Sequence, residues 1–137
     1  MYLLDTSALS ELIKRRPNTG FLARLRRQPA ETLYTSAICV MELRYGAWLR
    51  HDHEPFWRRL SQEILSRVQV VSFGEPEALA AGEILAHLKR AGRLVGLEDA
   101  LIAATARSHG FMVVTHNLKH FQSLPGVQAE DWFSADE

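Results

Sequence analysis

The stretch Tyr2-Leu3-Leu4-Asp5-Thr6-Ser7-Ala8-Leu9 joins a short apolar run to a segment with helical periodicity. Residues 2–4 are typical of a short buried strand. Leu9, Leu12 and Ile13 then recur at the spacing of a helix, for which Thr6 or Ser7 is a good N-cap. The sequence therefore places Asp5 where a buried strand ends and a helix begins.

The same alternation of strand and helix continues along the whole chain. Further strands are predicted at residues 33–35, 68–73 and 111–115, with an edge strand at 127–129. Helices are predicted at residues 18–27, 36–50, 56–65, 76–91 and 97–109. Short apolar strands that alternate with helices indicate an α/β fold of three layers, in which helices flank a short, mainly parallel central sheet.

Length and composition fit one soluble globular domain spanning residues 1–137. The sequence is 47% hydrophobic and 23% charged, which disfavours disorder and collagen-like or disulfide-rich folds. Formal net charge is +0 at pH 7, so no overall basic field attracts a nucleic acid. A nucleic-acid partner would have to be held by a local basic patch or by bound metal.

The single Cys39 lies in an apolar stretch and has no second cysteine with which to form an internal disulfide. It is best read as a small buried hydrophobic residue in a reducing compartment. The start of the chain does not read as a secretory signal, and no apolar run approaches the roughly 20 residues of a membrane span. These features lead us to expect a cytoplasmic protein without a membrane partner.

Three acidic residues stand out by their positions: Asp5 after the first strand, Glu42 in the second turn of the helix after the second strand, and Asp99 at the start of the helix before the fourth strand. In a parallel α/β sheet the strand-to-helix junctions share one edge, where ligands bind. The fold therefore predicts that these carboxylates converge.

Carboxylates gathered in one cleft repel one another, and a hard divalent cation such as Mg²⁺ or Mn²⁺ relieves that repulsion. Two such ions about 4 Å apart activate a water and stabilise the leaving oxygen of a phosphodiester. A simpler interpretation stays open for each residue. Asp5 and Asp99 could cap or begin helices, and Glu42 could pair with Arg44 or Arg50 at the surface.

The ordered set of motifs resembles the PIN-domain nucleases, and more closely the VapC-type toxins of type II toxin–antitoxin pairs. The resemblance rests on residues 2–9, 36–47, 96–104 and 113–121 and on the final Glu130-Asp131-Trp132, so it spans nearly the whole chain in order. It implies a PIN-like fold whose acidic site is Asp5, Glu42 and Asp99, with Ser7 as the hydroxyl that follows the first aspartate.

The resemblance also implies an activity and partners. Family members cleave RNA with Mg²⁺ or Mn²⁺, and as toxins they inhibit translation and growth. They usually form homodimers, and a small VapB-type antitoxin covers the active-site groove. That antitoxin also binds operator DNA, so DNA is expected as a partner only through the antitoxin.

The sequence departs from the family at one position. Many PIN nucleases carry a fourth acidic residue in the loop that Thr115 opens here, whereas this chain has Asn117. An amide can bind metal or water through its carbonyl but adds no negative charge, so a second ion would bind weakly or only with substrate phosphate. Arg44 is the most plausible rim residue to receive the RNA backbone, and His116 is weighed between a phosphate contact and an ordinary loop histidine.

Two other functions remain open at this point. The missing fourth acid could leave a catalytically weak PIN domain that acts as a binding module for its antitoxin. Alternatively, the same acidic site could belong to a DNA or structure-specific nuclease. The short chain, which has no added domain, argues against that last interpretation.

Overall fold

The computed structural model describes residues 1–134, so the last three residues of the predicted domain, 135–137, lie outside the described residues. The chain runs through β1 (Tyr2–Leu4), α1 (Thr6–Glu11), α2 (Thr19–Arg26), η1 (Ala30–Thr32), β2 (Leu33–Ser36), α3 (Ala37–Trp48), α4 (His53–Glu63), η2 (Leu65–Arg67), β3 (Gln69–Val71), α5 (Glu75–Arg90), α6 (Leu97–His109), β4 (Met112–Val114), η3 (Leu118–His120) and β5 (Gln128–Glu130). The predicted α/β class is confirmed.

All five strands form one parallel sheet in the order β3-β2-β1-β4-β5. The central strands β1 and β4 are covered on both faces, and their residues Leu3, Leu4, Val113 and Val114 are fully buried. At the β3 edge, by contrast, Val70 keeps 50% of its surface exposed. Burial on both faces explains why the central strands are continuously apolar in sequence.

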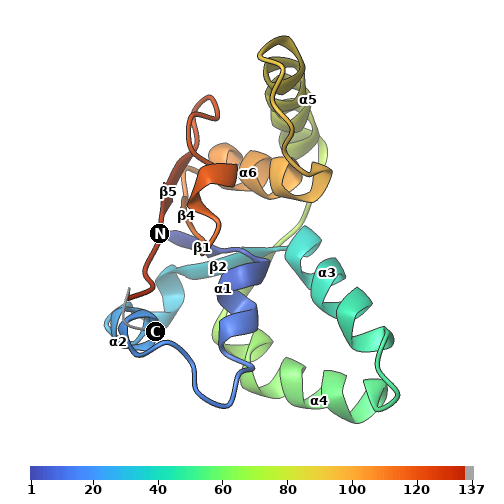
Figure 1. Cartoon of the computed structure of the whole chain (residues 1–137), viewed down its shortest axis with the longest axis vertical. Coiled ribbons are helices and arrows are strands. Elements are labelled where there is room, and N and C mark those ends of the chain that lie inside the picture. The colour runs from blue at the N-terminus through green and yellow to red at the C-terminus, as the bar shows by residue number, and fades with distance from the viewer. Residues whose placement is uncertain (135–137) are drawn as a thin grey trace.

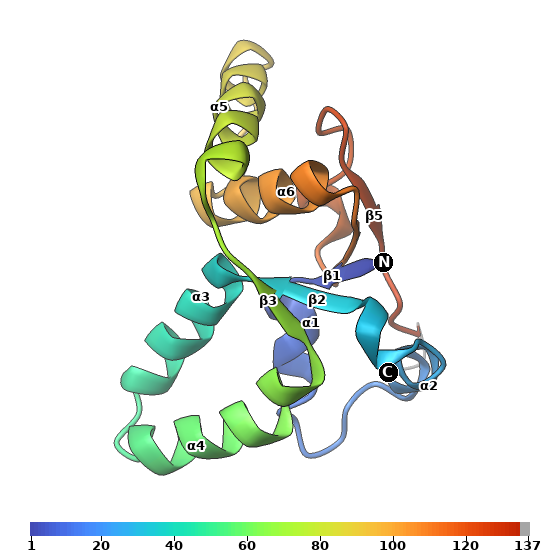
Figure 2. The ribbon, with the colours of Figure 1, turned by 180° about the vertical axis from the view of Figure 1, so that it is seen from behind.

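The two faces of the sheet are covered by helices from different parts of the chain (Figures 1 and 2). Helices α1 to α4 lie on one face, and α5 and α6 lie on the other. The chain first adds β2 and β3 on one side of β1 and then adds β4 and β5 on its other side. Because the connections are right-handed, the helices of the two halves lie on opposite faces of the sheet. The order of strands therefore reverses between β1 and β4. In open α/β sheets, ligands bind at such a switch point, beyond the carboxyl ends of the strands.

Side-chain caps fix the start of three helices. Asp5, Asn18 and Ser36 accept hydrogen bonds from the backbone N–H groups three residues later and so cap α1, α2 and α3. The prediction of Asn18 and Ser36 as caps is confirmed. The prediction of Thr6 or Ser7 as the cap of α1 is wrong, because the carboxylate of Asp5 already binds the N–H of Ala8.

Strands β2 to β5 differ from the predicted bounds by one or two residues, and a local cause is evident in β3 and β5. β3 is shorter than residues 68–73, since only Gln69–Val71 pair with β2 and the chain then turns toward Gly74, the N-cap of α5. β5 begins one residue later than predicted, because the N–H of Val127 bonds to the carbonyl of Leu124 and still belongs to the turn. Within residues 1–134, no helix has the length and apolar character needed to cross a membrane.

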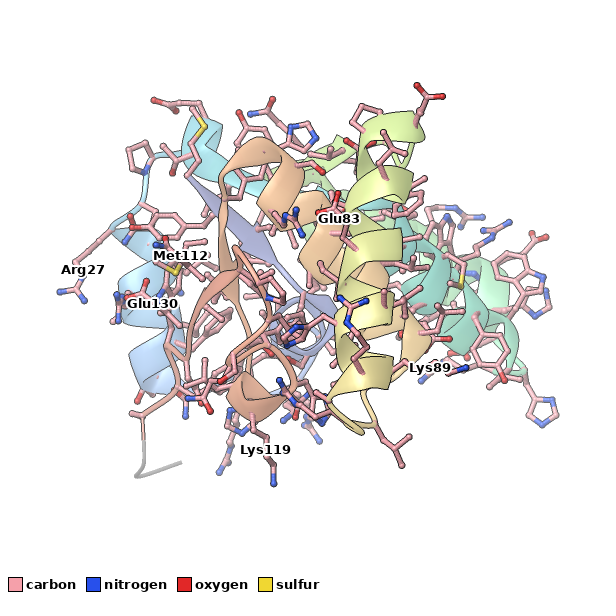
Figure 3. All side chains as sticks on the ribbon, turned by 90° about the horizontal axis from the view of Figure 1, so that it is seen from above. Arg27, Glu83, Lys89, Met112, Lys119 and Glu130 are labelled. Carbon is pink, nitrogen blue, oxygen red and sulfur yellow. The ribbon has the colours of Figure 1, made fainter. Side chains whose placement is uncertain are left out.

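Ion pairs join the outer elements to their neighbours. Glu83 on α5 contacts Arg107 on α6 at 2.5 Å, and Figure 3 shows Glu83 beside α6. Glu130, at the end of β5, accepts from Arg24 of α2 at 3.1 Å, on the side of the molecule where Figure 3 shows α2. The end of the described chain is thus attached to the layer that carries α1 and α2.

Candidate active site

Asp5 lies at the carboxyl end of β1, at the switch point of the sheet. Its own N–H donates to the carbonyl of Val114, so Asp5 continues the pairing of β1 with β4. Its Oδ1 accepts from the Ser7 hydroxyl at 2.7 Å and from the Ala8 N–H at 2.9 Å. Asp5 is only 3% exposed, so its carboxylate is both buried and held in one orientation.

Glu42 comes to the same edge from α3, which begins directly after β2. Its Oε1 accepts a short hydrogen bond from the hydroxyl of Thr6, the residue next to Asp5. Within residues 1–134, Glu42 makes no ion pair with Arg44 or Arg50, so the alternative prediction of a surface ion pair is wrong. Glu42 is half-buried and faces α1.

Asp99 stands in the first turn of α6, on the opposite layer from α1 and α3. Its Oδ2 is 2.7 Å from Nδ1 of His120 in η3, the short turn after β4. The Asp99 side chain is 25% exposed. It therefore combines access to solvent with a fixed hydrogen-bond partner.

The loop after β4 is tied to Asp5 through two hydroxyl groups. The N–H of His116 donates to Ser7 Oγ at 3.0 Å, and Ser7 in turn donates to Asp5. The N–H of Asn117 donates to Thr115 Oγ1 at 2.8 Å, and the buried Thr115 hydroxyl also bonds to Asp5. Ser7 and Thr115 thus position Asp5, while the side chain of Asn117 is exposed.

Mutual repulsion shows that the three carboxylates share one region. Burial raises the pKa of Asp5 above its ordinary range, and the charge of Asp99 raises it further against the hydrogen bonds from Thr115, Ser7 and Ala8. Burial also raises the pKa of Glu42, opposed by the Thr6 bond and reinforced by the charges of Asp99, Glu98 and Asp5. Asp5, Glu42 and Asp99 are thus close enough for their charges to act on one another, and their joint site stays a prediction.

The donor set fits a hard divalent cation in its chemistry. All the converging side-chain donors are oxygens, and their unrelieved negative charge is the kind that Mg²⁺ or Mn²⁺ compensates. As the side chains stand, no three His, Cys, Asp or Glu residues within positions 1–134 are arranged to hold one ion. Thr6 bonds to Oε1 of Glu42, and His120 bonds to Oδ2 of Asp99. Each bond uses one oxygen of its carboxylate, so the carboxylates would have to pivot about these bonds for their other oxygens to reach a shared ion.

The guanidinium of Arg44, the predicted rim residue, packs against aromatic rings of α3 and α4. It stacks on Trp48, 3.5 Å from the ring centroid, and contacts the ring of Trp57 on α4 at 4.9 Å. Together with residues of α4, Arg44 lines a cavity of about 420 Å³ between α3 and α4. Arg44 and Glu42 are two positions apart on a helix, so they face different sides of α3.

Two residues of the site are not identified by the sequence argument. The sequence suggests Thr6 only as a cap, although it holds Glu42, and assigns no role to His120, although it holds Asp99. These pairs are 36 and 21 residues apart in the chain, a separation that local sequence patterns do not bridge. The only signals for them are that Thr6 neighbours Asp5 and that His120 follows the fourth strand.

Comparison with known proteins places the chain in a family. The PIN domain matches residues 2–126. VapC ribonuclease Y4jK of Sinorhizobium fredii is 38% identical over 128 residues, which cover 90% of this chain and 91% of that protein. The tRNA(fMet)-specific endonuclease VapC of Salmonella typhimurium is 35% identical over 133 residues, covering 96% of this chain and 97% of that protein.

Solved structures show the same likeness in three dimensions. A chain of DNA-bound VapBC from Salmonella typhimurium superposes with a TM-score of 0.86 at 35% identity, covering 96% of this chain and 97% of that one. FitAcB from Neisseria gonorrhoeae gives a TM-score of 0.85 at 34% identity, over 94% of this chain and 96% of that one. The chain therefore belongs to the PIN-domain family and, within it, to the VapC proteins.

Proposed function

We propose that this protein is an endoribonuclease, the toxin of a VapB–VapC-type pair, and that it hydrolyses RNA phosphodiester bonds with Mg²⁺ or Mn²⁺. The observation that carries the proposal is the convergence of Asp5, Glu42 and Asp99 at the switch point of the sheet, with their charges coupled. The names of its relatives as VapC ribonucleases and a tRNA-specific endonuclease support RNA as the substrate.

The residues have distinct parts in the proposed reaction. Asp5, Asp99 and Glu42 would hold the divalent ion, which when bound acidifies a water and neutralises charge on the scissile phosphate. Glu42 would also orient the attacking water and receive a proton from it. Ser7 and Thr115 fix Asp5, while Thr6 and His120 set the orientation of Glu42 and Asp99.

We propose the partners on separate grounds. The structural neighbours include VapBC complexes, two of them bound to DNA, which supports a small VapB-type antitoxin over the acidic site and DNA contact through that antitoxin. A homodimer in the cytoplasm is proposed from the family. It is supported by Met41, Tyr45 and Leu49, whose side chains leave a row of apolar surface exposed along α3.

Cleavage of a defined single-stranded RNA by the purified chain tests the function. We expect products with Mg²⁺ or Mn²⁺ and none with EDTA, and a loss of rate of more than about a hundredfold in Asp99→Asn, because a metal ligand is removed. Glu98→Gln is the matched control, since it removes the same charge from the neighbouring, exposed position of α6. Equal rates for Asp99→Asn and the parent protein would contradict the assignment.

The same assay separates the two other functions. A DNA strand of the same sequence cut as fast as the RNA would identify a DNA nuclease. A chain that binds its antitoxin tightly but cuts neither strand with either ion would be a binding module. We expect cleavage of RNA alone.

A further inference from the structure

A small pocket beside the acidic site has no part in the mechanism above. It has a volume of about 220 Å³ and is lined by Glu11, Lys14, Arg16, Asn18, His116, Phe133 and Ser134. It is formed by the α1–α2 connection, the loop after β4 and the end of the described chain. Two hydrogen bonds join its wall to the site, from the His116 N–H to Ser7 and from Ser7 to Asp5.

One wall of the pocket is the end of a stack of aromatic rings. The ring of Phe21, fully buried, lies 4.8 Å from that of Phe133, and the Phe133 ring lies 4.1 Å from the imidazole of His116. The His116 side chain keeps 58% of its surface exposed. The stack therefore starts in the core and presents an imidazole to solvent, anchored from behind, next to the acidic site.

The other wall supplies positive charge. Both oxygens of the buried Glu11 are occupied, one by Lys14 at 2.8 Å and the other by the N–H of Asn18 at 2.7 Å. Arg16 is exposed and makes no ion pair with any residue between positions 1 and 134. A second carboxylate, that of Asp131, lies 3.5 Å from Nδ1 of His116. Lys14 is paired with Glu11, so Arg16 is the cation of the pocket that has no carboxylate partner among the described residues.

The His116 ring packs on Phe133 yet keeps 58% of its side chain exposed, and such a ring beside an unpaired guanidinium suits a nucleotide. Bases stack on aromatic side chains whatever their identity, and a guanidinium binds phosphate oxygens. We propose that this pocket holds the nucleotide next to the scissile phosphate of a single-stranded RNA, with its base on His116 and its phosphate on Arg16. The inference rests on the proposed function and names the position of the substrate beyond the acidic centre.

Binding of a short fluorescein-labelled single-stranded RNA, measured by anisotropy in EDTA, tests the pocket without cleavage. We expect Arg16→Ala to weaken binding about threefold to tenfold and to lower the slope of log Kd against log salt by about 0.7, the contribution of one phosphate contact on a single strand. Arg15→Ala is the matched control, because Arg15 is exposed but does not line the pocket. If the two variants share one affinity and one slope, the proposal is overturned.

The stacking contact is tested on its own. We expect His116→Ala to weaken binding about fivefold to tenfold with an unchanged salt slope, since a stacked base carries no charge. His116→Phe keeps a ring on Phe133 and should bind within about twofold of the parent. Equal RNA affinities of the alanine and phenylalanine variants would show that no base stacks on residue 116. Displacement of the RNA by an equal concentration of hexaglutamate, which carries charge but no bases, would show the same.

The outcome is independent of the test of activity. If Asp99→Asn loses cleavage while Arg16→Ala and His116→Ala bind RNA like the parent, the protein is a ribonuclease but the pocket does not bind its substrate. If both pocket variants bind RNA more weakly but the parent protein cuts no RNA with Mn²⁺, the pocket is an RNA-binding site and the proposed reaction is wrong.

Discussion

The carboxylate of Asp5 is buried and repelled by Asp99, so its pKa lies above the ordinary value of 3.8. A carboxyl with a raised pKa favours the folded state only while it is protonated, at low pH, and that contribution is lost as the pH rises through the raised pKa. The free protein therefore carries an electrostatic cost at neutral pH, which opposes the stabilisation that the same carboxylate gives as the cap of α1.

Asp5→Asn should remove this cost. The amide keeps an oxygen to accept from Ser7 and Ala8 but has no charge to bury, so we expect the midpoint of thermal unfolding at pH 7, without divalent ions, to rise by a few degrees. Melting curves between pH 3 and pH 8 check the sign, because the advantage of the variant should shrink toward low pH. A variant that melts below the parent at pH 7 would show that the carboxylate stabilises the free fold.

Thr6 positions Glu42 through one hydroxyl. Thr6→Val keeps the shape of the side chain but removes the bond, so we expect the rate of RNA cleavage under single-turnover conditions to fall about tenfold to a hundredfold. Thr6→Ser restores the hydroxyl and should recover most of the rate. A serine variant as slow as the valine variant, or full activity in the valine variant, would mean that Glu42 needs no such support.

The sequence predicts the positions of some residues of the candidate site but not of others. The places of Asp5, Glu42 and Asp99 in the fold could be predicted, because each follows a recognisable strand or lies early in a recognisable helix. The partners that orient them, Thr6 and His120, could not, since they depend on how far helices rotate and where a short turn places an imidazole. The same limit applies to Arg44, because its stacking on Trp48 and Trp57 depends on the packing of α3 against α4.

At the scale of elements, local chemistry decides where helices begin and end. The bounds of α2, α3, α5 and α6 agree with the prediction to within about two residues, because Asn18, Ser36 and Gly110 give explicit signals there. The short strands are harder to delimit from the sequence. Their ends depend on which neighbour they pair with, as in β3 and β5.

Gly82, inside α5, and Gly110, at the end of α6, differ in the backbone conformation that they adopt. Gly110 ends α6 with φ +70, where an L side chain is strained, while Gly82 lies inside α5, where an added Cβ would meet no atom within 4 Å. We expect Gly110→Ala to lower the free energy of unfolding by about 1 kcal/mol and Gly82→Ala to raise it by about 0.5–1 kcal/mol. Urea denaturation measures both, and a loss of stability in Gly82→Ala would show that α5 is constrained by more than its own backbone.

At the scale of the molecule, the order of strands creates the site. The reversal between β1 and β4 brings α1 and α3 on one layer to the same edge as α6 on the other, so that the charges of carboxylates 94 residues apart (5 to 99) act on one another. This much could be predicted from the alternation of elements and the handedness of their connections. The pocket at Arg16 and His116 could not, because it is closed by Phe133, which the chain reaches only after β5.

Asp5, Glu42 and Asp99 are proposed to bind one divalent ion together, and the whole mechanism depends on that shared ion. Isothermal titration of Mn²⁺ into the purified chain, and into Asp5→Asn, Glu42→Gln and Asp99→Asn, tests it most directly. We predict saturable binding to the parent protein and affinity at least about tenfold weaker in each of the three variants, although all remain folded. Parent-like Mn²⁺ affinity in any one of them would contradict the proposal, because that carboxylate would not share the ion.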